Sequence, residues 1–175
     1  MPDVFGYSAA MPQILKKTGI DYFLTSKISW NETNIMPYDS FMWKGIDGTE
    51  IFSSFITAQY AEKNHEIQCK TTYSGNLSAP LVLGTWDRYQ QKEYNKNTVI
   101  TYGYGDGGGG PTKQMLEKQR RLSCGLPGVP VTKTNSLLPY LQECEKEFLC
   151  NSKKLKRTPT WVGELYLEYH RGTYT

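Results

Sequence analysis

Helical and strand patterns alternate along this chain, and the alternation limits the folds open to it. A helix is predicted over residues 9–18, with Gly19 suited to its end. Apolar, aromatic-rich strands are predicted at 20–26 and on either side of an Asp47–Gly48 turn. Such an order predicts an α/β layer built on a mostly parallel sheet, whose functional residues follow the carboxyl ends of the strands.

The second half of the chain continues the same alternation. Val82, Trp86 and Tyr89 recur at i, i+4 and i+7, the spacing of one helical face. Pro111 suits the first turn of a helix and Gly125 suits its end. The predicted elements are a helix over 79–93, a strand over 97–105, a helix over 111–124, a short strand over 128–134 and a helix over 137–149.

Composition and charge narrow the class of protein. The chain has 175 residues, 38% of them hydrophobic, which is enough for one folded domain or part of a larger one. A net charge of +3 argues against a nucleic-acid partner. The sequence has no apolar run of the roughly 20 residues that span a bilayer and no secretory signal pattern, so we expect a cytoplasmic protein without a membrane partner. The cysteines are widely spaced, which indicates free thiols.

A glycine-rich stretch, TYGYGDGGGGPTK at 101–113, contains a single carboxylate, Asp106. It is not a Walker A loop, because Gly110 is followed by Pro-Thr-Lys. It matches G-x-G-x-x-G, but the next predicted strand has no acidic residue for a ribose, and Asp106 would repel a pyrophosphate. Two further interpretations stay open: a loop that presents Asp106 as a general acid or base, and a plain surface loop.

Asp3 is a second candidate carboxylate, placed just before the first predicted helix. Two carboxylates that face each other are the minimum for glycoside hydrolysis, which requires Asp3 and Asp106 to project into one cleft. A simple helix cap is the alternative for Asp3. His170 stands among tyrosines and is a candidate metal ligand or a structural residue, whereas His65 lies in a polar stretch and is expected to be exposed.

Five segments in this order resemble the family 38 α-mannosidases, and most closely the bacterial and cytosolic/vacuolar branch of that family. They are "PDVFGYSAAMPQILKKTGIDYFLTSKISWNETN", "FMWKGIDGTEI", "TWDRYQQKEYN", "YGYGDGGGGPT" and "WVGELYLEYHRGTYT". The resemblance covers nearly the whole chain. Because members of the family are much longer, it implies an internal fragment of the catalytic region: residues 1–135 in the second half of an incomplete (β/α) barrel, and 136–175 at the start of a helical-bundle region.

The resemblance also implies a retaining, zinc-dependent release of terminal α-D-mannose. In that mechanism Asp3 is the nucleophile and a zinc ligand, Asp106 is the acid/base, and His170 is a second zinc ligand. The substrate-binding positions implied are Phe5, Lys27 and Trp30, with Phe5 and Trp30 bordering the sugar and Lys27 standing where some relatives carry Arg.

One departure from the family pattern bears on the metal. Two further zinc ligands of the family belong to a His-x-Asp motif upstream of the Asp3 segment, and this sequence contains no His-x-Asp. We therefore expect the remaining ligands to come from the rest of a full-length enzyme, which would be a partner of this chain alongside an α-mannoside substrate. A non-catalytic carbohydrate-binding or interaction module on the same scaffold and a nucleotide-binding oxidoreductase domain are the alternatives.

Overall fold

The computed structural model describes residues 1–31, 34–59, 70–105 and 107–166. Its centre is a four-stranded sheet in the order β1 (Tyr22–Thr25), β3 (Glu50–Phe55), β2 (Ser40–Lys44) and β4 (Thr160–Val162). β1 pairs with β3 in parallel, β2 pairs with β3 as an antiparallel hairpin, and β4 adds to β2 in parallel. The sheet is therefore mixed, and the hairpin turns at Asp47–Gly48 as predicted.

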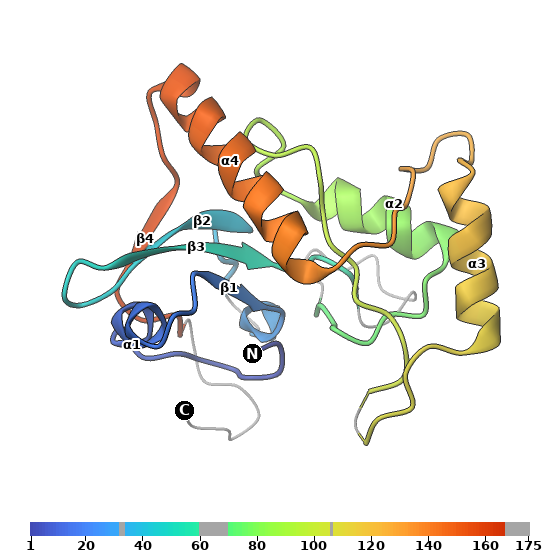
Figure 1. The fold of residues 1–175 in the computed structure, drawn as a ribbon, viewed down its shortest axis with the longest axis horizontal. Coiled ribbons are helices and arrows are strands. Elements are labelled where there is room, and N and C mark those ends of the chain that lie inside the picture. Colours follow the sequence, from blue (N-terminus) through green and yellow to red (C-terminus); the bar gives the residue numbers. More distant parts are fainter. Residues whose placement is uncertain (32–33, 60–69, 106, 167–175) are drawn as a thin grey trace.

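The strands alternate their side chains between the two faces of the sheet, as the pleat requires. Phe41, Trp43 and Ile51 face α1 (Met11–Lys17) and form a core with Leu15. Figure 1 shows α4 (Leu137–Leu155) crossing the sheet on the opposite side from α1. There Phe52 of β3 packs on Phe148 of α4, with ring centroids 5.3 Å apart.

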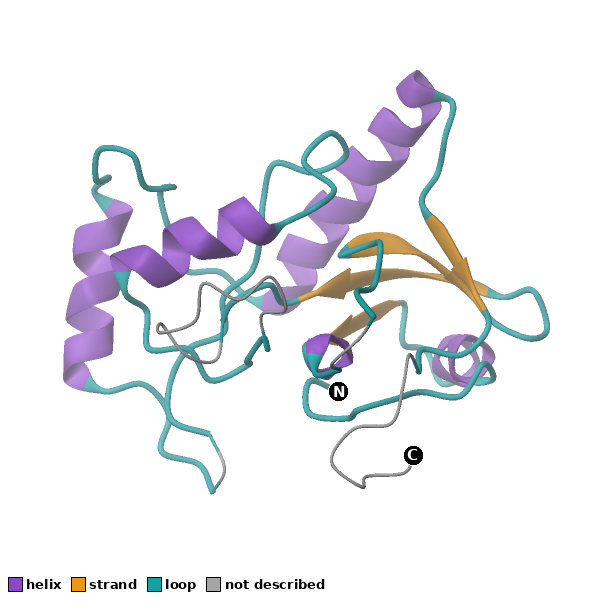
Figure 2. Ribbon diagram, turned by 180° about the vertical axis from the view of Figure 1, so that it is seen from behind, coloured by secondary structure: helices purple, strands orange, loops and turns teal. Residues whose placement is uncertain are grey.

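Two further helices extend the molecule beyond the carboxyl end of β3. α2 (Ala79–Arg88) begins at Ser78, whose side chain accepts a hydrogen bond from the Leu81 N–H. α3 (Lys113–Ser123) begins at Thr112, whose side chain caps the Met115 N–H in the same way. Figures 1 and 2 show the two helices lying together, away from the sheet. Val82 of α2 and Leu122 of α3 belong to one small core.

Several predicted boundaries are wrong for local reasons. The strand expected over 97–105 does not form; the region makes only isolated bridges, Gly75 with Tyr102 and Tyr104 with Gly110. The strand expected over 128–134 is likewise absent, because the chain turns back at Leu126–Val129 and Pro130 cannot donate a ladder hydrogen bond.

Other differences concern the helix ends. The helix expected over 79–93 stops at Arg88, since Tyr89 adopts an extended backbone. The helix expected over 137–149 continues to Leu155 and ends at Lys156, which has the left-handed conformation (φ 52°). β4, at Thr160–Val162, forms beyond the last element predicted from the sequence.

The α/β class predicted from the sequence is confirmed. The sheet is mixed instead of mostly parallel, and its described strands do not close, so the barrel remains a prediction. The division at residue 135 also stays a prediction. Two contacts cross this boundary, since α4 packs on β3 and β4 pairs with β2. Among the residues described, no helix is long and apolar enough to cross a membrane.

Candidate functional site

Asp3 lies beside the carboxyl end of β1, where the first residues of the chain are fastened to the strand. The Ser26 hydroxyl donates to the Pro2 carbonyl at 2.6 Å. Tyr7 exchanges two backbone hydrogen bonds with Leu165, at 3.0 and 2.9 Å, and its hydroxyl lies 2.7 Å from that of Thr25. These contacts fix the segment on both sides of Asp3, whose side chain remains about half exposed (51%).

Lys27 is the partner of Asp3 and is itself buried. It opens the 3₁₀ helix η1 (Lys27–Ser29) directly after β1, and its Nζ lies 3.4 Å from Asp3 Oδ1. The same nitrogen lies 3.7 Å from the ring centroid of Trp30 and 5.6 Å from that of Phe5. An ammonium group over aromatic faces is held by the negative potential of the rings. The predicted residues Asp3, Phe5, Lys27 and Trp30 are therefore brought together in one cluster.

The aromatic part of this cluster is fixed by hydrogen bonds. Trp30 Nε1 donates to the Thr71 carbonyl at 2.7 Å, and the Thr71 N–H donates to Ser29 Oγ at 3.0 Å. Phe5 meets Trp30 edge to face, with centroids 6.0 Å apart. Trp30 is only 5% exposed and supports the partly exposed Phe5 ring, which stands beside the Asp3 carboxylate. A carboxylate next to an apolar ring suits the mixed polar and apolar faces of a sugar.

Tyr73 completes the cluster, and no sequence pattern predicts its role. Its hydroxyl donates to Asp3 Oδ2 at 3.2 Å, and its ring lies 5.6 Å from Lys27 Nζ. Tyr73 belongs to a polar stretch with neither helical nor strand periodicity, and 70 positions separate it from Asp3. Only the folded chain shows that it orients this carboxylate.

The glycine loop is attached to the segment that carries Tyr73. The Gly75 N–H donates to the Thr101 carbonyl at 3.0 Å, and the Gly103 N–H donates to the Gly75 carbonyl at 3.0 Å. A Cβ built on Gly105 would lie 3.1 Å from Cε2 of Tyr73, so that position has no room to spare. Asp106 itself lies outside the described residues, but Gly105, its neighbour in sequence, contacts the tyrosine that touches Asp3.

The loop closes on itself through a short ladder. Tyr104 and Gly110 exchange backbone hydrogen bonds of 2.8 and 3.0 Å. Gly103 has φ +127°, and a Cβ there would meet the Gly110 carbonyl carbon at 2.7 Å, which no side chain tolerates. Glycine is thus required at the base of the loop by both backbone conformation and space.

The predicted metal site cannot be assembled from the described residues. His170 lies outside them, and within the described ranges no three His, Cys, Asp or Glu side chains lie together as a metal site. Asp3 could offer one carboxylate, but its two oxygens already face the Lys27 ammonium and the Tyr73 hydroxyl. These residues alone do not fit a zinc ion, which takes four ligands in structural sites or three plus water in catalytic ones.

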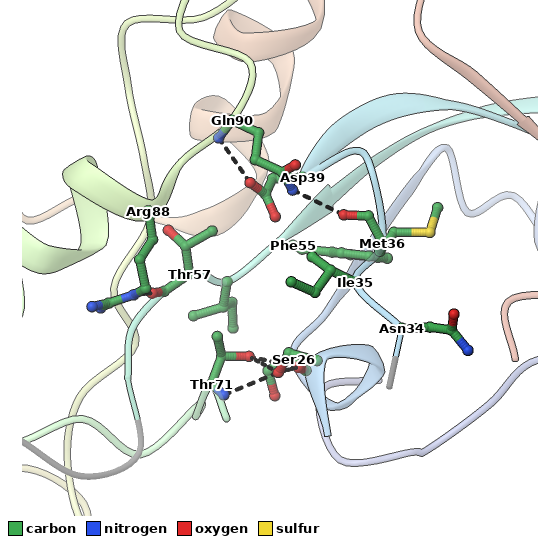
Figure 3. Close-up of a pocket in the computed structure, with 12 residues that line it drawn as sticks. Ser26, Asn34, Ile35, Met36, Asp39, Phe55, Thr57, Thr71, Arg88 and Gln90 are labelled. Carbon is green, nitrogen blue, oxygen red and sulfur yellow. Dashed lines mark hydrogen bonds between the residues drawn. The ribbon is translucent and has the colours of Figure 1, made fainter. Parts of the chain in front are cut away.

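A second carboxylate, Asp39, stands in a cavity of about 330 Å³ at the same edge of the sheet. Asp39 is only 9% exposed, and the Gln90 N–H donates to its Oδ2 at 2.9 Å, as Figure 3 shows. Burial raises the pKa of Asp39 to about 6, against the opposing effects of the Gln90 hydrogen bonds and of the positive charges of Lys92 and Arg88. No sequence motif identifies Asp39 as a site residue.

Fold and site together define a class: an α/β domain that presents a carboxylate beside an aromatic ring at the carboxyl edge of its sheet, where α/β proteins bind their ligands. Residues 1–164 match the family described as Glycosyl hydrolases family 38 N-terminal domain. The chain belongs to this family.

Individual relatives agree with the family assignment. The chain is 38% identical over 181 aligned residues to "Alpha-mannosidase" of Saccharomyces cerevisiae and 40% identical over 177 to human "Alpha-mannosidase 2C1". Both alignments cover 100% of this chain, which spans 15% of each relative's length. The solved structure of an alpha-mannosidase from Enterococcus faecalis is similar with a TM-score of 0.54 at 18% identity, covering 94% of this chain and 17% of that one. At that identity the structural likeness supports the fold alone.

Proposed function

We propose that this chain is the portion of an α-mannosidase that carries its nucleophile and its acid/base, and that the intact protein hydrolyses terminal α-D-mannosides with retention of configuration. The observation that carries the proposal is the chain of contacts from Asp3 through Tyr73 to Gly105. It places Gly105, the sequence neighbour of Asp106, close to the tyrosine that touches Asp3. This proximity supports the proposal that two carboxylates 103 positions apart in the sequence act at one site. Family membership and α-mannosidase relatives support the choice of sugar.

The proposed reaction has two steps. The Asp3 carboxylate attacks the anomeric carbon while Asp106 gives its proton to the leaving oxygen, and a glycosyl ester forms on Asp3. Asp106 then accepts a proton from water, which attacks the anomeric carbon and releases mannose and the Asp3 carboxylate. Retention requires the two carboxyl groups to stand roughly 5–5.5 Å apart.

The other residues of the cluster position the reacting groups. Lys27 and Tyr73 each hold one oxygen of Asp3, and so fix the direction of its lone pairs. The partly exposed Phe5 ring offers an apolar surface to the C–H face of the pyranose, and the buried Trp30 supports it edge to face. Because Trp30 is tied to Thr71, this support needs no ordering when substrate binds.

Zinc belongs to this proposal on the strength of the resemblance, with Asp3 and His170 as two of its ligands. A bound zinc ion would act as a Lewis acid toward sugar hydroxyls. The described residues do not complete its ligand set, and neither proposed step passes through the metal. Metal analysis of the purified protein, with His170→Ala as the comparison, tests this part separately from the sugar chemistry.

Release of p-nitrophenol from the α- and β-mannosides tests the proposed function. The measurement is made on this chain and on a longer protein that contains it, each with and without added zinc. We expect the longer protein to cleave the α-mannoside and leave its β-anomer, with α-mannose as the first product by NMR. Cleavage of neither anomer by either protein, or β-mannose as the first product, would contradict the proposal.

A further inference from the structure

The cavity that contains Asp39 is separate from the Asp3 cluster and has the lining of a binding site. We propose that it binds a small, neutral, polyhydroxylated molecule of about monosaccharide size. Its volume of about 330 Å³ lies in the range of pockets that hold small ligands. The proposal goes beyond the hydrolysis proposed above and does not depend on it. The two sites share only supporting residues, Ser26, Ser29 and Thr71, and none of the groups that touch Asp3 lines the cavity.

The cavity lies where α/β proteins place their ligands. It opens at the carboxyl ends of the parallel strands β1 and β3, between Ser26, which follows β1, and Ile56 and Thr57, which follow β3. Asp39 immediately precedes β2, whose first residue pairs with Ser54 near the same end of β3. Figure 3 shows side chains from these separate segments converging on one space.

The hydroxyl groups around the cavity have already donated their hydrogens. Thr57 Oγ1 donates to the Thr85 carbonyl at 2.8 Å, Ser26 Oγ to the Pro2 carbonyl at 2.6 Å, and Thr71 Oγ1 to the Ser26 carbonyl at 2.6 Å. Each hydroxyl has one hydrogen, so any further hydrogen bond that it makes must be as an acceptor. Together with the Asp39 carboxylate, they make a lining that calls for O–H or N–H donors.

The charges of the lining select a neutral ligand. Asp39 disfavours an anion in a space where it is itself 9% exposed. Arg88, which lines the same cavity and interacts electrostatically with Asp39, disfavours a cation. A hydroxyl group satisfies both conditions, because it is neutral and can donate a hydrogen bond to the carboxylate. Several hydroxyls on one small molecule would match the several acceptors.

One side of the cavity is apolar. Ile35, Met36 and Phe55 lie together on that side, across from Arg88 and Thr57 in Figure 3. A lining with polar groups opposite an apolar wall matches a ring that carries hydroxyls at its edge and C–H bonds on its face. Ile35 is 57% exposed, so it stands at the mouth of the cavity and can be enlarged without disturbing the core.

The 3₁₀ helix η1 separates this cavity from the Asp3 cluster. Its Lys27 reaches Asp3, whereas Ser29 lines the cavity. Two hydrogens can therefore report on the two places. The Gln90 N–H donates to Asp39 in the cavity, and the Trp30 indole N–H lies beside Lys27 and bonds to the Thr71 carbonyl at the border between the two.

Titration of the ¹⁵N-labelled protein with mannose, and with glycerol as a smaller probe, tests the proposal. We expect mannose to shift the Gln90 signal saturably. The affinity from this titration should be at least tenfold weaker in Asp39→Asn, and the shift should be abolished in Ile35→Phe, whose larger side chain fills the mouth of the cavity. Asp87→Asn removes an exposed carboxylate of α2 that does not line the cavity, and it should bind as the parent does. Asp3→Asn should retain the Gln90 shift.

Four results would overturn the proposal. The first is no Gln90 shift up to about 100 mM sugar, a concentration a hundred times a weak Kd of about 1 mM. The second is sugar-induced shifts confined to Trp30, and the third is equal affinity of Ile35→Phe and the parent protein for the sugar. The fourth is stronger binding of acetate or methylguanidinium than of mannose. Because Asp3→Asn removes the proposed nucleophile without touching the cavity, failure of the cavity proposal and failure of the hydrolase proposal give different data.

Discussion

Asp3 and Asp39 stand at the same edge of one sheet, on either side of a three-residue 3₁₀ helix, yet the fold treats the two carboxylates differently. Asp3 is half exposed and shares its oxygens with a lysine and a tyrosine. Asp39 is buried, held by a backbone N–H, and its pKa is raised to about 6. The same side chain is thus made an oriented, accessible group in one place and a desolvated acceptor in the other. Substitutions at each carboxylate should separate chemistry from stability.

The largest effect is expected from Asp3→Asn. The amide keeps the shape of the side chain but cannot act as the nucleophile, so hydrolysis of p-nitrophenyl α-mannoside by the intact protein should fall about 10³-fold or more. Because Asp3 is half exposed, the free energy of unfolding should change by no more than about 1 kcal/mol. Asp87→Asn, which changes an exposed carboxylate in the same way, is the matched control. An equal loss of activity in Asp87→Asn would contradict the catalytic role of Asp3.

Asp39→Asn should act on stability, and in a pH-dependent way. The folded state holds the Asp39 proton up to about pH 6, while the unfolded chain releases it near pH 3.8, so the folded protein loses stability as pH rises between these values. Two pKa units correspond to about 3 kcal/mol, an upper bound on what the buried charge costs above pH 6.

The asparagine carries no such charge, and its side-chain oxygen can still accept from Gln90. Denaturant unfolding from pH 4 to pH 8 should therefore show a smaller decline for Asp39→Asn than for the parent. Identical pH profiles for the two proteins would show that the surroundings of Asp39 do not penalise its charge, and would remove the contrast with Asp3.

Gly103→Ala should damage the loop that bears Asp106. The substitution strains a backbone at φ +127° and forces a Cβ within 2.7 Å of Gly110, at a cost of about 2–3 kcal/mol in closing the loop. Gly108→Ala is the matched control: φ is also positive, at +79°, but no atom lies within 4 Å of the new Cβ, and about 1 kcal/mol is expected. Activity should fall more for Gly103→Ala, and equal losses would refute the role given to Gly103.

The smallest effect is expected from Lys27→Met, which keeps the packing of the side chain beneath Trp30 and removes its charge. Asp3 then loses one of its two positioning contacts, and kcat/KM should fall about tenfold with little change in stability. Lys27→Arg, which restores a cation, should recover part of the loss. Full activity in Lys27→Met would show that Tyr73 alone is enough to orient Asp3.

Sequence patterns predicted helices and strands well where the apolar residues followed a single periodicity. The hairpin around Asp47–Gly48 and helices α1, α2, α3 and α4 all appear, with shifted ends. Patterns failed at 97–105, where β-branched residues resemble a strand but the chain makes only isolated bridges. They failed again after residue 158, where the short strand β4 depends on the edge of β2. Strand formation depends on a partner, and a single sequence does not show which edges are available.

By itself, the sequence determined the α/β class, through the spacing of its apolar residues, and the family, through five motifs in order. It also nominated Asp3, Phe5, Lys27 and Trp30, which the fold gathers into one cluster. Only the tertiary structure decided that Tyr73 joins them and that Asp39 is buried in a cavity of its own. The physical reason is that periodicity governs contacts a few residues apart, whereas desolvation and pairing depend on segments that meet from tens of positions away.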